Sequence, residues 1–145
     1  MQTSRQLFDG FSLEPPREWE NVTEEGSSTF SFSKADGVGA LQFSVGLYQR
    51  GVDPEVSIND LREMILDFSS KRGLGVGSDL VMREEPTMLI GQSHSTRGRF
   101  LRVWYVSDGR NVALATYNCS LEDIGVELKE CERIVASFRF EPLST

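Results

Sequence analysis

The sequence predicts an α+β fold, in which a central antiparallel β-sheet of about six or seven strands packs against two main α-helices. Three observations support this prediction. Several short segments alternate apolar and polar residues, two segments place apolar residues at helical spacing, and turn residues separate neighbouring segments. The chain has 145 residues, of which 39% are apolar. One core can form from such a chain, whereas two independent domains would each be marginal, so residues 1–145 are expected to form a single domain.

The first strands are predicted before residue 50. Residues 11–13 alternate and are followed by two prolines, which is typical of an edge strand and a turn. Residues 29–33 also alternate, and residues 39–48 do so after an Asp-Gly turn. In this last strand the apolar side chains share one face. The opposite face, which carries Gln42, is small and polar.

Two helices are predicted. The first spans residues 57–72, because Ser57-Ile-Asn-Asp60 forms a capping-box pattern and Gly73 suits a helix C-terminus. The second begins after Ser120, which we expect to be its cap, and most of its acidic residues are expected to lie off its apolar stripe. That stripe consists of Leu121, Ile124, Leu128, Cys131, Ile134, Val135 and Phe138. A short final strand follows at Phe-Arg-Phe.

Asp108-Gly109 is the strongest hairpin signal in the chain and predicts a two-residue loop. In the register that follows, Ser107 lies opposite Arg110, and the face carrying Tyr105 is the core side. The other face then brings together three aromatic residues and one guanidinium, which we call the aromatic–arginine cluster. Its members are Phe100, Arg102, Trp104 and Tyr117.

The aromatic–arginine cluster, together with Gln42, is the candidate partner-binding site. Trp, Tyr and Arg dominate binding hot spots, and arginine stacks on aromatic rings. Two alternatives remain open. In one, a helix covers this face and the aromatic residues belong to the core. In the other, a pocket over Arg102 recognises the anionic group of a small ligand or substrate.

Catalysis, metal binding and cofactors have little support in the sequence. His94 is the single histidine, so a pair with Cys119 is the one nucleophile and base combination considered. Cys131 lies about 15 Å along the predicted helix from its start. A disulfide with Cys119 needs Cα atoms within about 7 Å. We therefore expect free structural cysteines, a non-enzymatic protein, and neither a cofactor nor a metal site.

The net charge of −7 and a pI near 4.8 disfavour binding to nucleic acid or to an anionic membrane. The longest apolar runs have four residues, and the first 16 residues contain no signal-like segment. We therefore expect a cytoplasmic protein. A protein partner is expected, and a second copy of the chain is left open as that partner.

The order of the predicted elements matches a known arrangement. A strand ends before Trp19, another contains GALQFSV, a capped helix follows, the meander contains RVWYVSDGRNVALATYNC, and a closing helix runs into ERIVASFRF. This order resembles the PsbP-like superfamily, which includes photosystem PsbP subunits, Ran-binding Mog proteins, bacterial DcrB-like lipoproteins and the Eag chaperones of type VI secretion. The resemblance implies a central antiparallel sheet with packed helices and a non-enzymatic binding role.

The function expected from these observations is that of a cytoplasmic, bacterial-type binding module. Such a module would be a secretion chaperone, an adaptor or a toxin-neutralising immunity protein. The acidic charge is compatible with masking a basic partner.

Overall fold

The computed structural model describes residues 2–143. Within these residues the chain forms two α-helices, one 3₁₀ helix and ten strands. In chain order they are β1 (Gln6–Phe8), β2 (Phe11–Leu13), β3 (Trp19–Asn21), β4 (Thr29–Lys34), β5 (Gly39–Gly46), α1 (Ile58–Lys71), β6 (Ser78–Arg83), β7 (Met88–Thr96), β8 (Arg99–Ser107), β9 (Val112–Ser120), η1 (Leu121–Asp123), α2 (Ile124–Ala136) and β10 (Arg139–Phe140).

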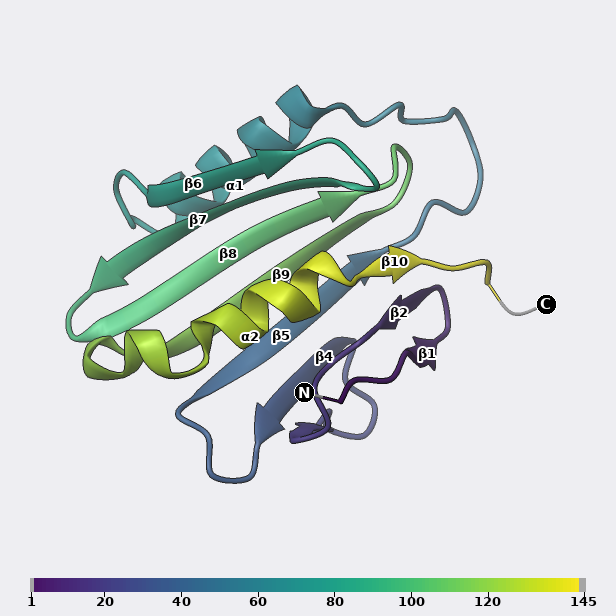
Figure 1. Ribbon diagram of the computed structural model, residues 1–145. Helices are drawn as coiled ribbons and strands as arrows, with labels where there is room; N and C mark the ends of the chain where they lie inside the picture. The colour runs from purple at the N-terminus through teal and green to yellow at the C-terminus, as the bar shows by residue number, and fades with distance from the viewer. Residues whose placement is uncertain (1, 144–145) are drawn as a thin grey trace.

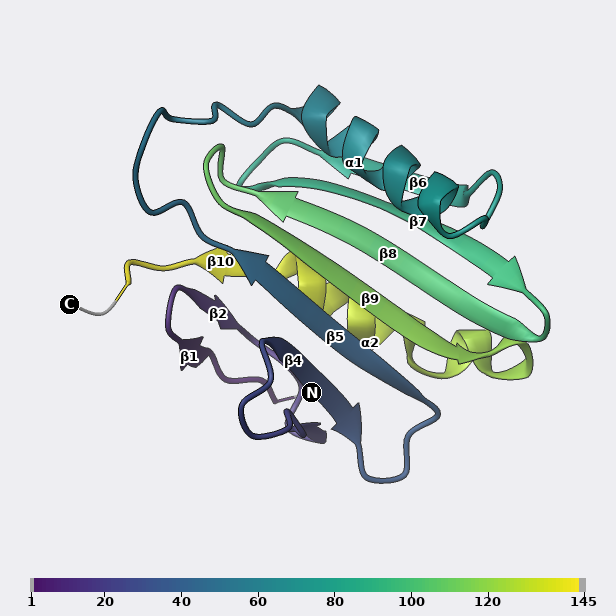
Figure 2. The ribbon, with the colours of Figure 1, turned by 180° about the vertical axis from the view of Figure 1, so that it is seen from behind.

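Seven of these strands form the main sheet, in the order β3-β4-β5-β9-β8-β7-β6, with antiparallel neighbours throughout. Helix α2 lies across one face of this sheet (Figure 1), and helix α1 lies on the other face (Figure 2). The predicted α+β fold, with a central antiparallel sheet of six or seven strands and two packed helices, is confirmed.

Helix α1 begins as predicted. The Ser57 hydroxyl accepts a hydrogen bond from the Asp60 backbone N–H, and the Asp60 side chain accepts one from the Ser57 N–H, which completes the capping box. The buried side of α1 packs on β7 and β8. Strands β9, β5 and β4 extend beyond α1 on this face (Figure 2). One helix therefore covers only part of this side of the sheet.

The start of α2 differs from the prediction. The Ser120 side chain makes no capping hydrogen bond, because Ser120 is still part of β9, where it pairs with Arg99. The η1 turn at Leu121–Asp123 then leads into the helix, and the Leu121 N–H donates to the Gly98 carbonyl. The Leu121 N–H is one of the backbone donors at the helix start that have no partner within the helix, and the β7–β8 turn supplies its acceptor.

The loop between β8 and β9 is longer than predicted. Ser107 pairs with Val112 instead of Arg110, so four residues form the loop. The Asp108 carboxylate accepts hydrogen bonds from two backbone N–H groups, those of Arg110 and Asn111, which closes this wider turn. The register error is two residues, and because side chains alternate with period two, every residue stays on its predicted face.

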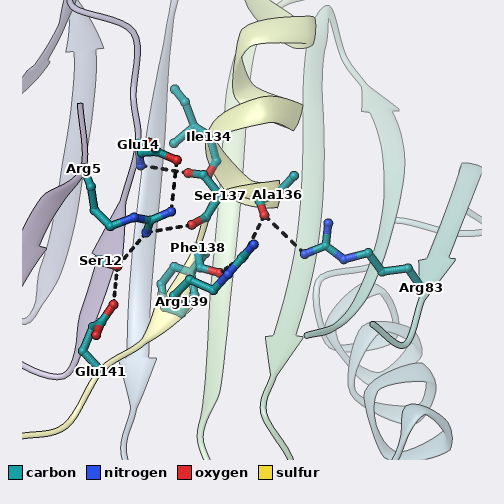
Figure 3. Close-up of polar contacts among 10 residues, drawn as sticks. All are labelled: Arg5, Ser12, Glu14, Arg83, Ile134, Ala136, Ser137, Phe138, Arg139 and Glu141. Carbon is teal, nitrogen blue, oxygen red and sulfur yellow. Dashed lines mark hydrogen bonds and ion pairs between the residues drawn. The ribbon is translucent and has the colours of Figure 1, made fainter. Parts of the chain in front are cut away.

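A small second sheet joins the beginning and the end of the described chain, in the order β1-β2-β10. The prediction that residues 11–13 form an edge strand is wrong, because β1 and the predicted final strand, β10, flank them. Arg5 donates to the Ser12 hydroxyl and to the Ser137 carbonyl beyond α2, as Figure 3 shows. Arg83 and Arg139 both donate to the Ala136 carbonyl, where positive charge suits a helix C-terminus.

Candidate functional site

Helix α2 buries the whole aromatic–arginine cluster. Phe100, Arg102, Trp104 and Tyr117 are at most 4% exposed. The alternative in which a helix covers this face is therefore the observed one, and the aromatic residues belong to the core. The face carrying Tyr105, predicted as the core side, is the less buried of the two, since Tyr105 is only partly buried while Trp104 is fully buried. The physical reason is that the apolar stripe of α2 packs on the cluster.

The polar atoms of the cluster are fixed by α2 and by neighbouring strands. Arg102 Nε lies 2.8 Å from Glu132 Oε1, and Trp104 Nε1 donates to Glu132 Oε2 at 3.0 Å. A second Arg102 nitrogen donates to the Asp79 carbonyl at 2.7 Å and to the Ser93 hydroxyl at 3.0 Å. Three of the five N–H groups of the guanidinium thus donate to groups of the protein, and Arg102 is only 2% exposed, so a ligand from solvent cannot reach it.

Two further carboxylates of α2 accept hydrogen bonds from aromatic residues of the main sheet. Tyr117 donates to Glu127 at 3.0 Å, and Trp19 Nε1 donates to Glu130 at 2.6 Å. The expectation that the acidic residues lie off the stripe is therefore wrong for Glu127, which is 1% exposed. The sequence does contain a signal for this burial. Glu127 lies four residues before Cys131, and positions i and i+4 share a helix face.

Burial raises the pKa of the Tyr117 hydroxyl, and the hydrogen bond to Glu127 raises it further. Tyr117 is therefore a neutral donor at physiological pH. Burial also raises the pKa of both thiols, so Cys119 and Cys131 are unreactive. Both cysteines are free, as predicted. These groups lock α2 to the sheet, and neither a nucleophile nor a general base is exposed among them.

Gln42 lies on the opposite face of the sheet from the cluster, so the prediction that they form one binding site is wrong. It donates to the Ser31 hydroxyl at 3.1 Å and lines a hollow of about 320 Å³ beside α1. Arg72 borders the same hollow, with its guanidinium carbon 3.7 Å from the centre of the Phe68 ring. The structure thus brings four of the predicted site residues together and leaves Gln42 apart from them.

His94 contacts Ser69 and Gln92 on the α1 face, whereas Cys119 is buried on the α2 face. The considered pair with Cys119 is therefore absent. Gln92 Nε2 lies 3.0 Å from Ser69 Oγ and 3.1 Å from His94 Nε2. Burial lowers the pKa of His94, and the Leu74 backbone opposes this in part. No spacing in the sequence pointed to this group, because its members come from α1 and β7.

An exposed apolar surface runs from α1 over the 73–77 loop to β6, and we call it the β6 patch. Its residues are Leu66, Val76, Leu80, Val81 and Met82, which are 58%, 99%, 57%, 42% and 39% exposed, respectively. Val81 lies on the α2 side of β6, and the other four residues lie on the α1 side. A hollow of about 540 Å³ opens within the patch, between Leu66, Val76 and Leu80, and the polar side chains of Ser69 and Gln92 also line it. This surface could not be predicted from the sequence, because residues 80–82 have the pattern of an ordinary strand.

In the described chain, no group of three or more His, Cys, Asp or Glu side chains is placed to hold a metal ion. Neither helix within residues 2–143 is long and apolar enough to cross a lipid bilayer.

Two solved structures share this arrangement of elements. A crystal structure of a protein from Bacteroides thetaiotaomicron VPI-5482 superposes with a TM-score of 0.67 at 19% identity, and the match covers 97% of this chain and 49% of the other. The solution structure of cyanobacterial PsbP (CyanoP) from Synechocystis sp. PCC 6803 gives a TM-score of 0.61 at 11% identity, over 97% of this chain and 92% of the other. The fold is PsbP-like. The chain spans about half the length of the Bacteroides protein.

At these identities the likeness establishes the PsbP-like fold, which hosts different functions and transfers none by itself. No family model matches the sequence, and no curated protein matches it. Function must therefore be argued from the surfaces described above.

Proposed function

We propose that the chain is a non-catalytic protein-binding module. The β6 patch carries this proposal, because its exposed apolar side chains gather around one edge strand, and exposed apolar patches are typical of protein interaction sites. The binding surface is thus moved from the buried aromatic–arginine cluster to the α1 and β6 side of the molecule. The cluster keeps a supporting role, since it fixes α2 and the sheet on which the patch is built.

The absence of catalysis in this proposal is supported by the Ser69 and His94 geometry. Ser69 Oγ lies 3.0 Å from the Ile65 carbonyl, to which it donates, and Gln92 donates toward His94 Nε2. The hydroxyl proton and the imidazole lone pair are therefore engaged with other groups. A nucleophile would need both for attack.

Within this proposal, a secretion chaperone, an adaptor and an immunity protein are the candidate roles, because each holds a segment of another protein. The two free, buried thiols of Cys119 and Cys131 suit a reducing compartment, which supports a cytoplasmic site of action. The net charge of −7 favours a basic partner.

The test is affinity capture of partner proteins by the wild type and two variants. The patch variant carries Leu80→Asp and Val81→Asp. The control variant carries Val52→Asp and Val126→Asp. The control residues are also exposed but lie outside the patch, at 92% and 59%. We expect one protein to be retained by the wild type and the control and to be lost with the patch variant. Equal retention by all three proteins would refute the proposal.

A second candidate function is binding of a small anionic ligand, and Arg72 is the observation that favours it. Arg102 is only 2% exposed and is paired with Glu132, so the hollow that Arg72 and Gln42 line takes the place of the pocket expected over Arg102. Titration with inorganic phosphate, followed by NMR, should shift Thr116 and Gln42 if this function is correct. An Arg72→Gln variant that responds to phosphate like the wild type would exclude it.

A further inference from the structure

We propose that the β6 patch binds an extended, apolar segment of a partner protein as an additional strand on β6, with basic residues flanking that segment. This inference rests on the proposed function and specifies the partner and the mode of binding. It follows from the position of β6 in the sheet, the side chains that flank its free edge, and the charges at its ends.

Strand β6 is the last strand of the main sheet, and its outer edge has no neighbouring strand within residues 2–143. Five of its six residues are exposed. An edge strand presents unpaired backbone N–H and C=O groups, to which an extended peptide can add by hydrogen bonding. Natural sheets often protect such edges with charged side chains. Here Leu80, Val81 and Met82 occupy the middle of the strand instead.

A bulge interrupts the pairing of β6 with β7 between Ser78 and Val81, and bulges also blunt edges. Asp79 lies in this bulge with a φ of 52°, and its carbonyl turns to accept a hydrogen bond from Arg102. Regular pairing resumes at Val81 and continues to Arg83. The available edge is therefore the second half of β6.

The side chains on both sides of this edge suit alternate residues of an added strand. Leu80 borders the hollow of about 540 Å³ that Leu66 and Val76 also line, so an apolar side chain of the partner can enter it. Val81 pairs with Gly91, which pairs with Trp104, so Val81 points to the α2 face. An added strand would thus place one apolar side chain in the hollow and the next beside Val81.

The charges near β6 favour a basic partner over a second copy of this chain. Glu84, Glu85 and Asp108 line a further hollow of about 330 Å³ just beyond the end of β6. Asp79 is exposed at the other end. Arg83, at the same end of β6 as these glutamates, donates to Thr87 and to the Ala136 carbonyl. Each copy carries a net charge of −7, which disfavours the pairing of two copies. Lysine or arginine residues beside an apolar segment would be attracted to the carboxylates near β6.

The experiment uses the full chain and a synthetic peptide in which a run of valine residues lies between two pairs of lysines. Binding is followed by NMR titration. We expect saturable shifts at the backbone amides of residues 80–83 and slower hydrogen exchange there. A Leu80→Glu variant should lose these shifts, whereas a Val126→Glu control should keep them. Shifts that are absent, or that occur elsewhere, would overturn the proposal.

Two N-methylated peptides test the strand geometry directly. Only every second amide of an added strand points to β6, so methylation of one alternate set should weaken binding about tenfold or more, while methylation of the other set should have little effect. Equal effects of the two methylation patterns would refute strand addition. Replacement of the lysines by glutamates should also weaken binding, and unchanged affinity would refute the basic partner.

A second copy of the chain is the competing occupant. A dimer that sedimentation detects without peptide, and that Leu80→Glu or the peptide dissociates, would assign the edge to self-association and overturn this inference. The two proposals fail differently. If capture depends on the patch but the two methylated peptides behave alike, only the strand mode is wrong. If capture does not depend on the patch, the proposed function is wrong.

Discussion

The two helices that cover the faces of the main sheet are held by different contacts. Helix α2 packs on the sheet through an apolar core. Its carboxylates also accept hydrogen bonds from Tyr117, Trp19 and Trp104. Helix α1 sits through a smaller apolar cluster that includes Leu61 and Ile65, and it leaves Leu66 exposed. Polar anchors define where α2 must lie, so this face is scaffold. The other face retains open surface, where binding can occur.

The largest effect is expected at the Arg102 anchor. Glu132→Ala removes the carboxylate that pairs with a buried guanidinium, so we expect a loss of about 3 kcal/mol in the free energy of unfolding. Denaturant unfolding followed by Trp fluorescence measures it. Glu63→Ala, at an exposed carboxylate on α1, is the matched control. A double variant with Arg102→Met and Glu132→Leu should recover only part of the loss, because the buried Trp104 Nε1–H then lacks its acceptor. A cost below about 1 kcal/mol for Glu132→Ala would show that α2 does not depend on this pair.

A smaller loss is expected from Tyr117→Phe. The hydroxyl is the donor to Glu127, and its removal leaves a buried carboxylate with fewer donors at a cost of about 2 kcal/mol. Tyr48→Phe provides a comparison, since its hydroxyl donates to the Gly51 carbonyl at an exposed site. If both variants unfold at the same denaturant concentration, the hydrogen bond from Tyr117 to Glu127 adds no more to stability than an exposed one, and the described difference between the two faces would be wrong.

The α1 face should respond to pH through His94. Its pKa is lowered in the folded protein because burial disfavours the charged imidazole, so the unfolded chain binds the proton more tightly. The stability that this group provides is present above about pH 6.5 and is lost as the pH falls toward the lowered folded value. Unfolding free energies measured at several pH values should show this slope. A His94→Gln variant should lose it, because the chain has no other histidine. If the variant shows the same dependence of unfolding free energy on pH, that dependence comes from carboxylates and not from His94.

The smallest effect on stability is expected in the β6 patch. Leu66→Ser changes a side chain that is 58% exposed, and surface substitutions of this kind alter stability by at most about 0.5 kcal/mol. Thermal unfolding measures this effect, with Leu61→Ser as the contrasting buried variant. A large loss for Leu66→Ser would mean that the patch is part of the core, and the two faces would then not differ as described.

Local patterns predicted most of the fold. The capping box of Ser57 and Asp60, the alternation in β4 and β5, and the apolar spacing of α2 each depend on residues close in sequence. Register was harder, because Asp108-Gly109 favours a two-residue loop while the Asp108 side chain stabilises a four-residue one. The error in the predicted register was two residues, so each side chain stayed on its predicted face. The four members of the cluster were therefore grouped correctly although the predicted loop was too short.

The site could not be predicted in the same way, because exposure depends on distant elements. Arg102 and Trp104 fit an exposed binding face equally well until α2, from the end of the chain, is placed over them. Leu80 and Val81 have the pattern of an ordinary strand, and only the sheet order shows that β6 has no outer neighbour in residues 2–143. The contacts of Ser69 with His94 likewise join residues 25 positions apart.

The placement of α2 and β10 also has a consequence for synthesis on the ribosome. Trp104 and Phe43 are synthesised before Glu132 and Phe138, which pack against them, and β2 completes its sheet only when β10 is present. The nascent chain therefore exposes these aromatic side chains until residues 124–140 have left the exit tunnel. Slow translation of this last segment would prolong the period in which the unfinished domain is prone to aggregate.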